Sequence, residues 1–157
     1  MSIDEIISPE STLTGLCISS KKRLFEFIAD FFCDAFKFES LESQVIVTLL
    51  NNREKLGSTG IGNGVAIPHC RYENITSPKG IFIKLDEPLP FDTPDTLHVD
   101  IVLFLLLPSS NHEASLKILS NVAHLFNDPN NRNEIRKADT NQALYATISQ
   151  LAKKENA

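Results

Sequence analysis

The feature that most constrains the fold is an almost unbroken apolar run from Val99 to Leu107. A strand with one face in water alternates apolar and polar residues, whereas a strand covered on both faces is apolar nearly throughout. The run is also far shorter than the roughly 20 apolar residues that a helix needs to cross a bilayer. It therefore predicts a central strand with helices on both faces of its sheet, and no insertion into a membrane.

Segments with helical or strand-like periodicity surround this central run, and capping residues and prolines set their expected boundaries. Three of the expected helices lie at residues 3–7, 38–52 and 133–137. Three more are expected to begin at a capping residue: one starts at Lys21 after Ser19 or Ser20, one follows a cap at 109–111, and one runs from a cap at Asp139 to Leu151. Further strands are expected at 12–18 and 80–85, the second before a loop with Pro88, Pro90 and Pro94. The helix after 109–111 is predicted to face inward with Leu116, Leu119, Val122, Ala123 and Phe126. This alternation predicts an α/β fold, with the sheet as the middle layer of an α/β/α sandwich.

Composition narrows the class of protein. The 157 residues, 42% hydrophobic and 22% charged, are typical of one soluble domain spanning residues 1–157, with an ordered core at about 3–152 and a frayed tail from Lys153. The net charge of −5 argues against a nucleic-acid partner. Three cysteines without metal-ligand spacing predict no metal site and reduced thiols. The N-terminus lacks the features of a signal peptide, so we expect a cytoplasmic protein.

A glycine-rich segment marks the candidate site. Four of the six glycines fall between Gly57 and Gly64, ahead of an apolar triplet, Pro68 and His69. The spacing fits neither a P-loop nor a dinucleotide-binding fingerprint, because the last glycine precedes a strand-like segment and not a Lys-Ser/Thr pair or a helix. A histidine where such a strand ends would be exposed and rigidly held. The alternative is an ordinary turn followed by a surface histidine.

The segment from Leu56 to His69 follows Arg53-Glu54 and reads Leu-Gly-Ser-Thr-Gly-Ile-Gly-Asn-Gly-Val-Ala-Ile-Pro-His. This segment resembles the signature of type-2 IIA domains of the phosphoenolpyruvate-dependent phosphotransferase system. The nitrogen-regulatory group is the most similar, ahead of the fructose and mannitol types. The resemblance runs from about Ile3 to the end of the chain. It implies a mixed sheet and a phosphoryl group carried by Nε2 of His69, with no cofactor.

Phosphoryl transfer sets the requirements for the other site residues. An imidazole near its ordinary pKa of about 6.5 is largely neutral at pH 7 and can attack phosphorus. Charge spread over the phosphoryl oxygens calls for donors, for which the Arg53 guanidinium and the backbone N–H groups of the glycine segment are candidates. The predicted phosphate-binding residues are Arg53, Gly60, Gly62, Asn63 and Gly64.

A second histidine is implied by the resemblance but departs from it here. Related domains carry that histidine at the position of Ser115. Either Ser115 or His112, one helical turn earlier, is therefore a candidate for a supporting role beside the phosphoryl group. A surface histidine at a helix start is the other interpretation of His112.

The resemblance implies a regulatory phosphoryl carrier of the nitrogen branch. The donor would be an HPr-like histidine-containing phosphocarrier, and the phosphorylation state would control regulated target proteins such as sensor kinases or potassium-transport components. Two alternatives stay open. A sugar-specific IIA component would pass the phosphoryl group to a separate IIB protein, and a binding-only module, suggested by Ser115, would have lost phosphotransfer.

Overall fold

The apolar run forms the central strand of a six-stranded mixed sheet in the computed structural model, which describes residues 1–155 and all their side chains except those of residues 40 and 41. The strands are β1 (Thr12–Leu16), β2 (Gly60–Gly62), β3 (Val65–Ala66), β4 (His69–Tyr72), β5 (Lys79–Leu89) and β6 (Val99–Pro108). Their order is β1-β5-β6-β3-β2, with β4 also paired to β6. The β1–β5, β3–β6 and β4–β6 pairs are parallel, and the β2–β3 and β5–β6 pairs are antiparallel.

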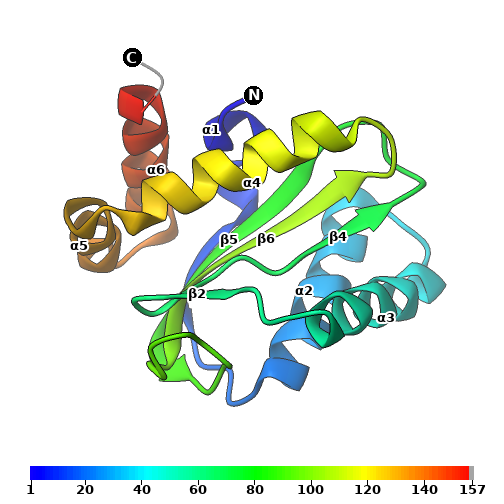
Figure 1. Ribbon diagram of the computed structural model, residues 1–157, viewed down its shortest axis with the longest axis horizontal. Coiled ribbons are helices and arrows are strands. Elements are labelled where there is room, and N and C mark those ends of the chain that lie inside the picture. The colour runs from blue at the N-terminus through cyan, green and yellow to red at the C-terminus, as the bar shows by residue number, and fades with distance from the viewer. Residues whose placement is uncertain (156–157) are drawn as a thin grey trace.

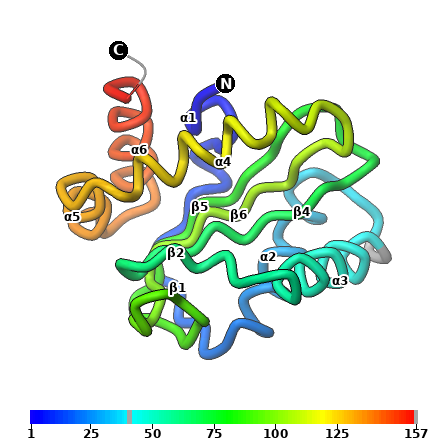
Figure 2. Tube along the Cα trace, in the orientation of Figure 1, coloured from blue at the N-terminus to red at the C-terminus, as the bar shows by residue number. Residues whose placement is uncertain are grey.

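Helices cover both faces of this sheet (Figure 1). The helices are α1 (Ile3–Ile6), α2 (Lys21–Phe36), α3 (Ser40–Lys55), α4 (His112–Asn127), α5 (Pro129–Lys137) and α6 (Asn141–Glu155), with a 3₁₀ turn at Pro9–Ser11. Helices α2 and α3 form one layer, and the other four lie on the opposite face, where α1 lies beside α6 (Figure 2). The predicted α/β/α sandwich on a mixed sheet is confirmed.

Alternating side chains of β6 fill two separate cores, as expected for a strand covered on both faces. Phe104 packs edge-on against Phe32 of α2, with ring centroids 6.1 Å apart. On the other face, Leu103 and Leu105 join the cluster in which Phe82 packs against Phe126 of α4, with centroids 5.8 Å apart. Each such aromatic side chain contributes about 1.5–3 kcal/mol by leaving water. The apolar run is therefore the shared wall of both cores.

Side-chain caps set several helix starts. Ser20 Oγ accepts a hydrogen bond from the Arg23 N–H, and Asn111 Oδ1 accepts one from Ala114 N–H, so one of the expected capping residues is in place at each of these helices. The predicted Asp139 cap is wrong, because Thr140 Oγ1 accepts the hydrogen bond from the first turn of α6. The predicted 133–137 helix is also too short. Asp128 caps α5 one residue before Pro129, a residue whose fixed φ suits a first helical position.

Three further expectations differ from the structure. Strand β5 continues through Pro88 to Leu89, because its pairing with β6 shifts in register after Lys84, and a proline is tolerated at such an irregularity. Leu116 is 61% exposed and not inward-facing, since Ser115, Ile118 and Val122 form the buried stripe of α4. Helix α6 extends beyond the expected end to Glu155, and residues 156–157 of the expected domain lie outside the described chain.

Candidate functional site

His69 opens the short strand β4 at the edge of the sheet. The sequence predicted that a strand ends here, but Pro68 only interrupts the pairing: β3 and β4 both run parallel to β6, with Val65 opposite Ile101 and His69 opposite Leu105. The Pro68 carbonyl still accepts a hydrogen bond from the Leu105 N–H, at 2.9 Å. The backbone of His69 is therefore fixed on both sides of the proline.

Two hydrogen bonds define the state of the His69 ring. Nδ1 lies 2.9 Å from the carbonyl oxygen of Ile67, which can only accept, so Nδ1 carries the proton. Nε2 accepts from Nε–H of Arg53 at 3.2 Å and thus holds the lone pair. This tautomer, assigned from the hydrogen-bond network, gives a neutral ring whose Nε2 lone pair could act as a nucleophile.

Arg53 reaches His69 from the last turn of α3, in the helical layer on the other face of the sheet. Its Nη1 donates to the Gly57 carbonyl at 2.7 Å, which orients the planar guanidinium toward the ring. The neighbouring Glu54 holds the following loop, since its carboxylate accepts hydrogen bonds from the N–H and hydroxyl of Thr59 and pairs with Lys21 at 2.7 Å. Arg53, predicted as a phosphate-binding residue, thus lies against the His69 imidazole.

The surroundings keep the imidazole neutral. Partial burial is the main cause that lowers the pKa of His69 below its ordinary value, and the positive charges of Arg53 and Arg71 lower it further. The hydrogen bond to Ile67 and the charge of Glu54 act in the opposite direction. Because the pKa is lowered from its ordinary value, the neutral form of the ring predominates at pH 7, and this is the form of an imidazole that can act as a nucleophile.

The glycine turn lies away from His69. Val65 and His69 pair with β6 residues four positions apart, which is about 13 Å of strand, and Gly62–Gly64 lie beyond the Val65 end. The Asn63 N–H donates to Asp95 Oδ2 at 2.7 Å, and the Gly60 N–H donates to Ser58 Oγ at 3.1 Å. The structure thus does not bring Gly62, Asn63 or Gly64 to the imidazole, whereas Gly60 pairs with Ala66, three residues before His69.

The residues around the glycine turn account for its composition. Gly64 has φ +80°, and a Cβ there would lie 2.5 Å from Arg136 Nη2 and 2.8 Å from Asp100 Oδ1. Arg136 pairs with Asp100 through Nε and Nη2, at 3.0 and 2.9 Å, and Nη2 also donates to the Asn63 carbonyl at 2.7 Å. The carboxylates of Asp95 and Asp100 make this turn a poor place for a phosphate.

Helix α4 carries the two other predicted residues. Ser115 is almost fully buried, and His112 is exposed in the first turn of the helix. The hydrogen bonds described for the His69 ring go to Arg53 and Ile67, and neither Ser115 nor His112 is among these partners.

Two neighbours of His69 on β4 were not among the predicted site residues. Cys70 faces the α2–α3 core, where burial raises the pKa of its thiol to about 12, so it remains a neutral core residue. Arg71 shares the face of His69, because side chains two positions apart in a strand point the same way. The His-x-Arg spacing in the sequence indicates that the two side chains share a face only if both residues lie in one strand, and the sequence predicted that the strand ends at His69.

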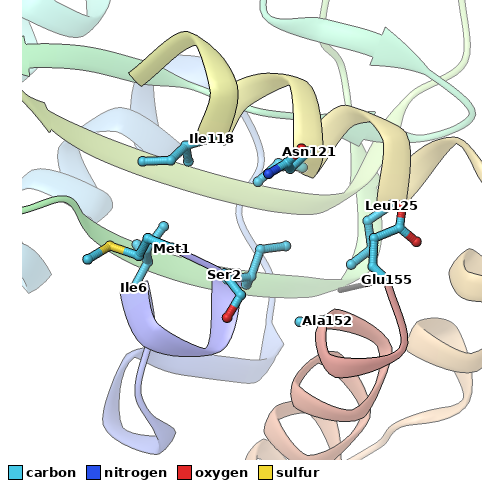
Figure 3. Close-up of a pocket in the computed structure, with 10 residues that line it drawn as sticks. Met1, Ser2, Ile6, Ile118, Asn121, Leu125, Ala152 and Glu155 are labelled. Carbon is cyan, nitrogen blue, oxygen red and sulfur yellow. The ribbon is translucent and has the colours of Figure 1, made fainter. Parts of the chain in front are cut away.

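A separate hollow between α1, α4 and α6 is lined by Met1, Ile118 and Glu155, among others (Figure 3). Its volume of about 20 Å³ holds little more than one water molecule. Within the described residues, no group of three or more His, Cys, Asp or Glu side chains could hold a metal ion.

The helices in residues 1–155 are all too short or too polar to cross a membrane.

Fold and site together define an α/β domain with a mixed sheet and an edge-strand imidazole held by a guanidinium. Residues 5–151 match the protein family described as phosphoenolpyruvate-dependent sugar phosphotransferase system, EIIA 2. The chain belongs to this family. A nitrogen regulatory protein of Pseudomonas aeruginosa is 38% identical over 146 residues, which cover 93% of this chain and 94% of the relative.

Solved structures agree with this assignment. The crystal structure of nitrogen regulatory protein IIA-Ntr from Neisseria meningitidis matches with a TM-score of 0.84 and 33% identity, over 93% of this chain and 98% of that one. IIA mannitol from Escherichia coli matches with a TM-score of 0.70 over 90% of this chain and 97% of that one. At 16% identity, this second likeness shows the fold alone.

Proposed function

We propose that this chain is a cytoplasmic phosphoryl-carrier protein of the nitrogen-regulatory type, which accepts a phosphoryl group on Nε2 of His69 from an HPr-like phosphocarrier. The phosphorylated and unphosphorylated forms bind regulated partner proteins differently. The observation that carries the proposal is the His69 ring, with its proton fixed on Nδ1 and its lone pair beside Arg53. The names of the more similar relatives favour the nitrogen-regulatory type over the sugar-specific alternative.

The reaction is a transfer between two imidazoles. The Nε2 lone pair of His69 attacks phosphorus, the new P–N bond forms, and the P–N bond to the donor histidine breaks. The donor ring, protonated on its other nitrogen, leaves as a neutral imidazole with the electron pair of the broken bond. His69 becomes a phosphorylated ring that keeps its Nδ1 proton, and the Ile67 carbonyl stabilises the positive charge that the ring gains.

Arg53 has two successive positions in this scheme. In the unphosphorylated protein its Nε–H occupies the lone pair that must attack, at 3.2 Å. The guanidinium therefore has to move from Nε2 to the phosphoryl oxygens as the donor approaches, where its planar fork suits two oxygens at once.

The test is incubation with phosphoenolpyruvate and the general and nitrogen-branch phosphorelay proteins, followed by intact mass measurement. We expect one acid-labile phosphoryl group on the wild type, none on His69→Ala, and an unchanged level on His98→Ala, whose exposed histidine lies in the β5–β6 connection. Labelling of His69→Ala at the wild-type level would contradict the assignment. Partner binding without any phosphate uptake by the wild type would select the binding-only alternative.

A further inference from the structure

Arg71 carries an unusual unmet hydrogen-bond donor. Within the part of the chain whose side chains are described, its Nη1 is the only buried side-chain nitrogen or oxygen without a hydrogen-bond partner. A guanidinium stays charged in proteins, and a donor withdrawn from water without an acceptor is costly. None of the ion pairs described between residues 1 and 155 includes Arg71. An acceptor for this nitrogen has to come from outside the described structure.

The direction of the side chain points to His69. Residues 69 and 71 pair with Leu105 and Leu107 of β6, which belong to the core on the α4 face. Cys70 and Tyr72 alternate to the opposite core. His69 and Arg71 thus share a face, about 7 Å apart along the strand. The charge of Arg71 is close enough to lower the pKa of His69.

We propose that Arg71 is a second phosphate-binding residue, whose Nη1 donates to an oxygen of the phosphoryl group carried by Nε2 of His69. This inference rests on the proposed function. Arg53 comes from the α2–α3 layer and Arg71 from the α4 face of β4, so the two cations would hold the group from both faces of the sheet edge. Ser115 could offer at most one neutral hydroxyl donor, whereas a donor on a charged group forms a bond about twice as strong.

The experiment compares wild type, Arg71→Gln and Arg71→Lys with Arg23→Gln, a control that removes an exposed guanidinium from α2. The readouts are the rate of phosphoryl uptake, the lifetime of the phosphohistidine and the pKa of His69 from an NMR titration. For Arg71→Gln we expect uptake slower by about tenfold or more, the effect of losing one charge-assisted hydrogen bond. The lifetime should shorten, and the pKa of His69 should rise because a nearby cation is gone.

Arg71→Lys keeps both a charge and a long apolar stem, so it should retain the wild-type pKa and part of the rate. If Arg71→Gln does not fold, Arg71→Lys still tests the role of Arg71 in phosphoryl uptake. Arg71 variants that match Arg23→Gln in both uptake rate and phosphohistidine lifetime would overturn the inference.

A wild type that takes up no phosphate would refute the proposed function instead. Titration with inorganic phosphate would then decide the role of Arg71. Joint shifts of the His69 ring and Arg71 Nε–H signals, abolished in Arg71→Gln, would support phosphate binding at this place. Signals that do not move would overturn it.

Discussion

The two ends of the β3–β4 edge differ in how their arginines are neutralised. At the glycine turn, Arg136 makes a two-point ion pair with Asp100 and donates to the Asn63 carbonyl. At the His69 end, neither Arg53 nor Arg71 belongs to any ion pair described between residues 1 and 155. A neutralised cation fastens one element to another, whereas cations without an acidic partner are free to bind an incoming anion.

This comparison reverses the apparent importance of the two segments. The glycines are the most conspicuous residues of the motif, yet they serve the turn that Asp95, Asp100 and Arg136 hold in place. The candidate chemistry lies with residues of ordinary appearance on α3 and β4. Substitutions at the glycine end should therefore change stability, and substitutions at the His69 end should change phosphoryl uptake.

After the complete loss of uptake expected for His69→Ala, the largest expected effect comes from Arg53→Ala. Removing a charged donor from the developing phosphoryl charge should slow uptake by about 100-fold, or roughly 3 kcal/mol of barrier. The free energy of unfolding should change by only about 0.5–1 kcal/mol, because Arg53 is partly exposed. Stopped-flow or quenched transfer kinetics and chemical unfolding would measure the two quantities.

Lys55→Ala is the matched control for Arg53→Ala, since it removes an exposed cation from the same last turn of α3. It should leave the uptake rate within about twofold of the wild type, as expected for an exposed side chain outside the site. Equal uptake rates for Arg53→Ala and Lys55→Ala would mean that Arg53 is an ordinary solvated cation. They would also contradict the proposed difference between the His69 end and the glycine turn.

The next effect in size belongs to Gly64→Ala, at the other end of the edge. The positive φ costs an L-residue about 1–2 kcal/mol, and the new Cβ would also push Arg136 away from Asp100. We expect a free energy of unfolding lower by about 2 kcal/mol and an unchanged uptake rate per folded molecule. Urea unfolding monitored by circular dichroism, together with uptake kinetics, would test both.

Gly15→Ala separates the two causes of that loss. Gly15 has a similar φ of +75°, but a Cβ there meets nothing within 4 Å. Its cost should be backbone strain alone, about 1 kcal/mol. If Gly64→Ala instead slowed uptake more than it lowered stability, the glycine turn would have to take part in phosphate binding after all.

Sequence alone went far with the fold and less far with the site. The apolar run from Val99 predicted the central strand, because a strand buried on both faces is apolar nearly throughout, whereas a half-exposed strand alternates apolar and polar residues. Pro68 was misleading, since a proline normally ends sheet pairing, yet here the chain resumes along the same neighbour as β4. Because the chain continues as β4 after Pro68, His69 lies further along β6 than the glycine turn, and the side chain of Arg71 lies on the same face of β4 as that of His69. Neither consequence could be known before the register with β6 was known.

The rotation of α4 was also beyond the sequence pattern. Leu116 and Ser115 are neighbours, and the apolar one was predicted to face inward. In the structure Leu116 is 61% exposed and Ser115 is 2% exposed. An exposed leucine near a helix start costs little, and the packing of Ile118 and Val122 decides which face is buried.

The smallest expected effect concerns the start of α4. His112 is exposed, and no hydrogen bond described here joins it to the His69 ring, so His112→Ala should leave the uptake rate and the phosphohistidine lifetime within about twofold of the wild type. Ser115→Ala is the proper companion variant, because a histidine at this nearly buried position would overpack the helix interface at a cost of about 1–3 kcal/mol. A tenfold loss of rate in His112→Ala, with Ser115→Ala unaffected, would mean that the helix start closes over the phosphoryl group when the donor binds. The His69 end would then depend on a side chain of α4 in addition to the two arginines.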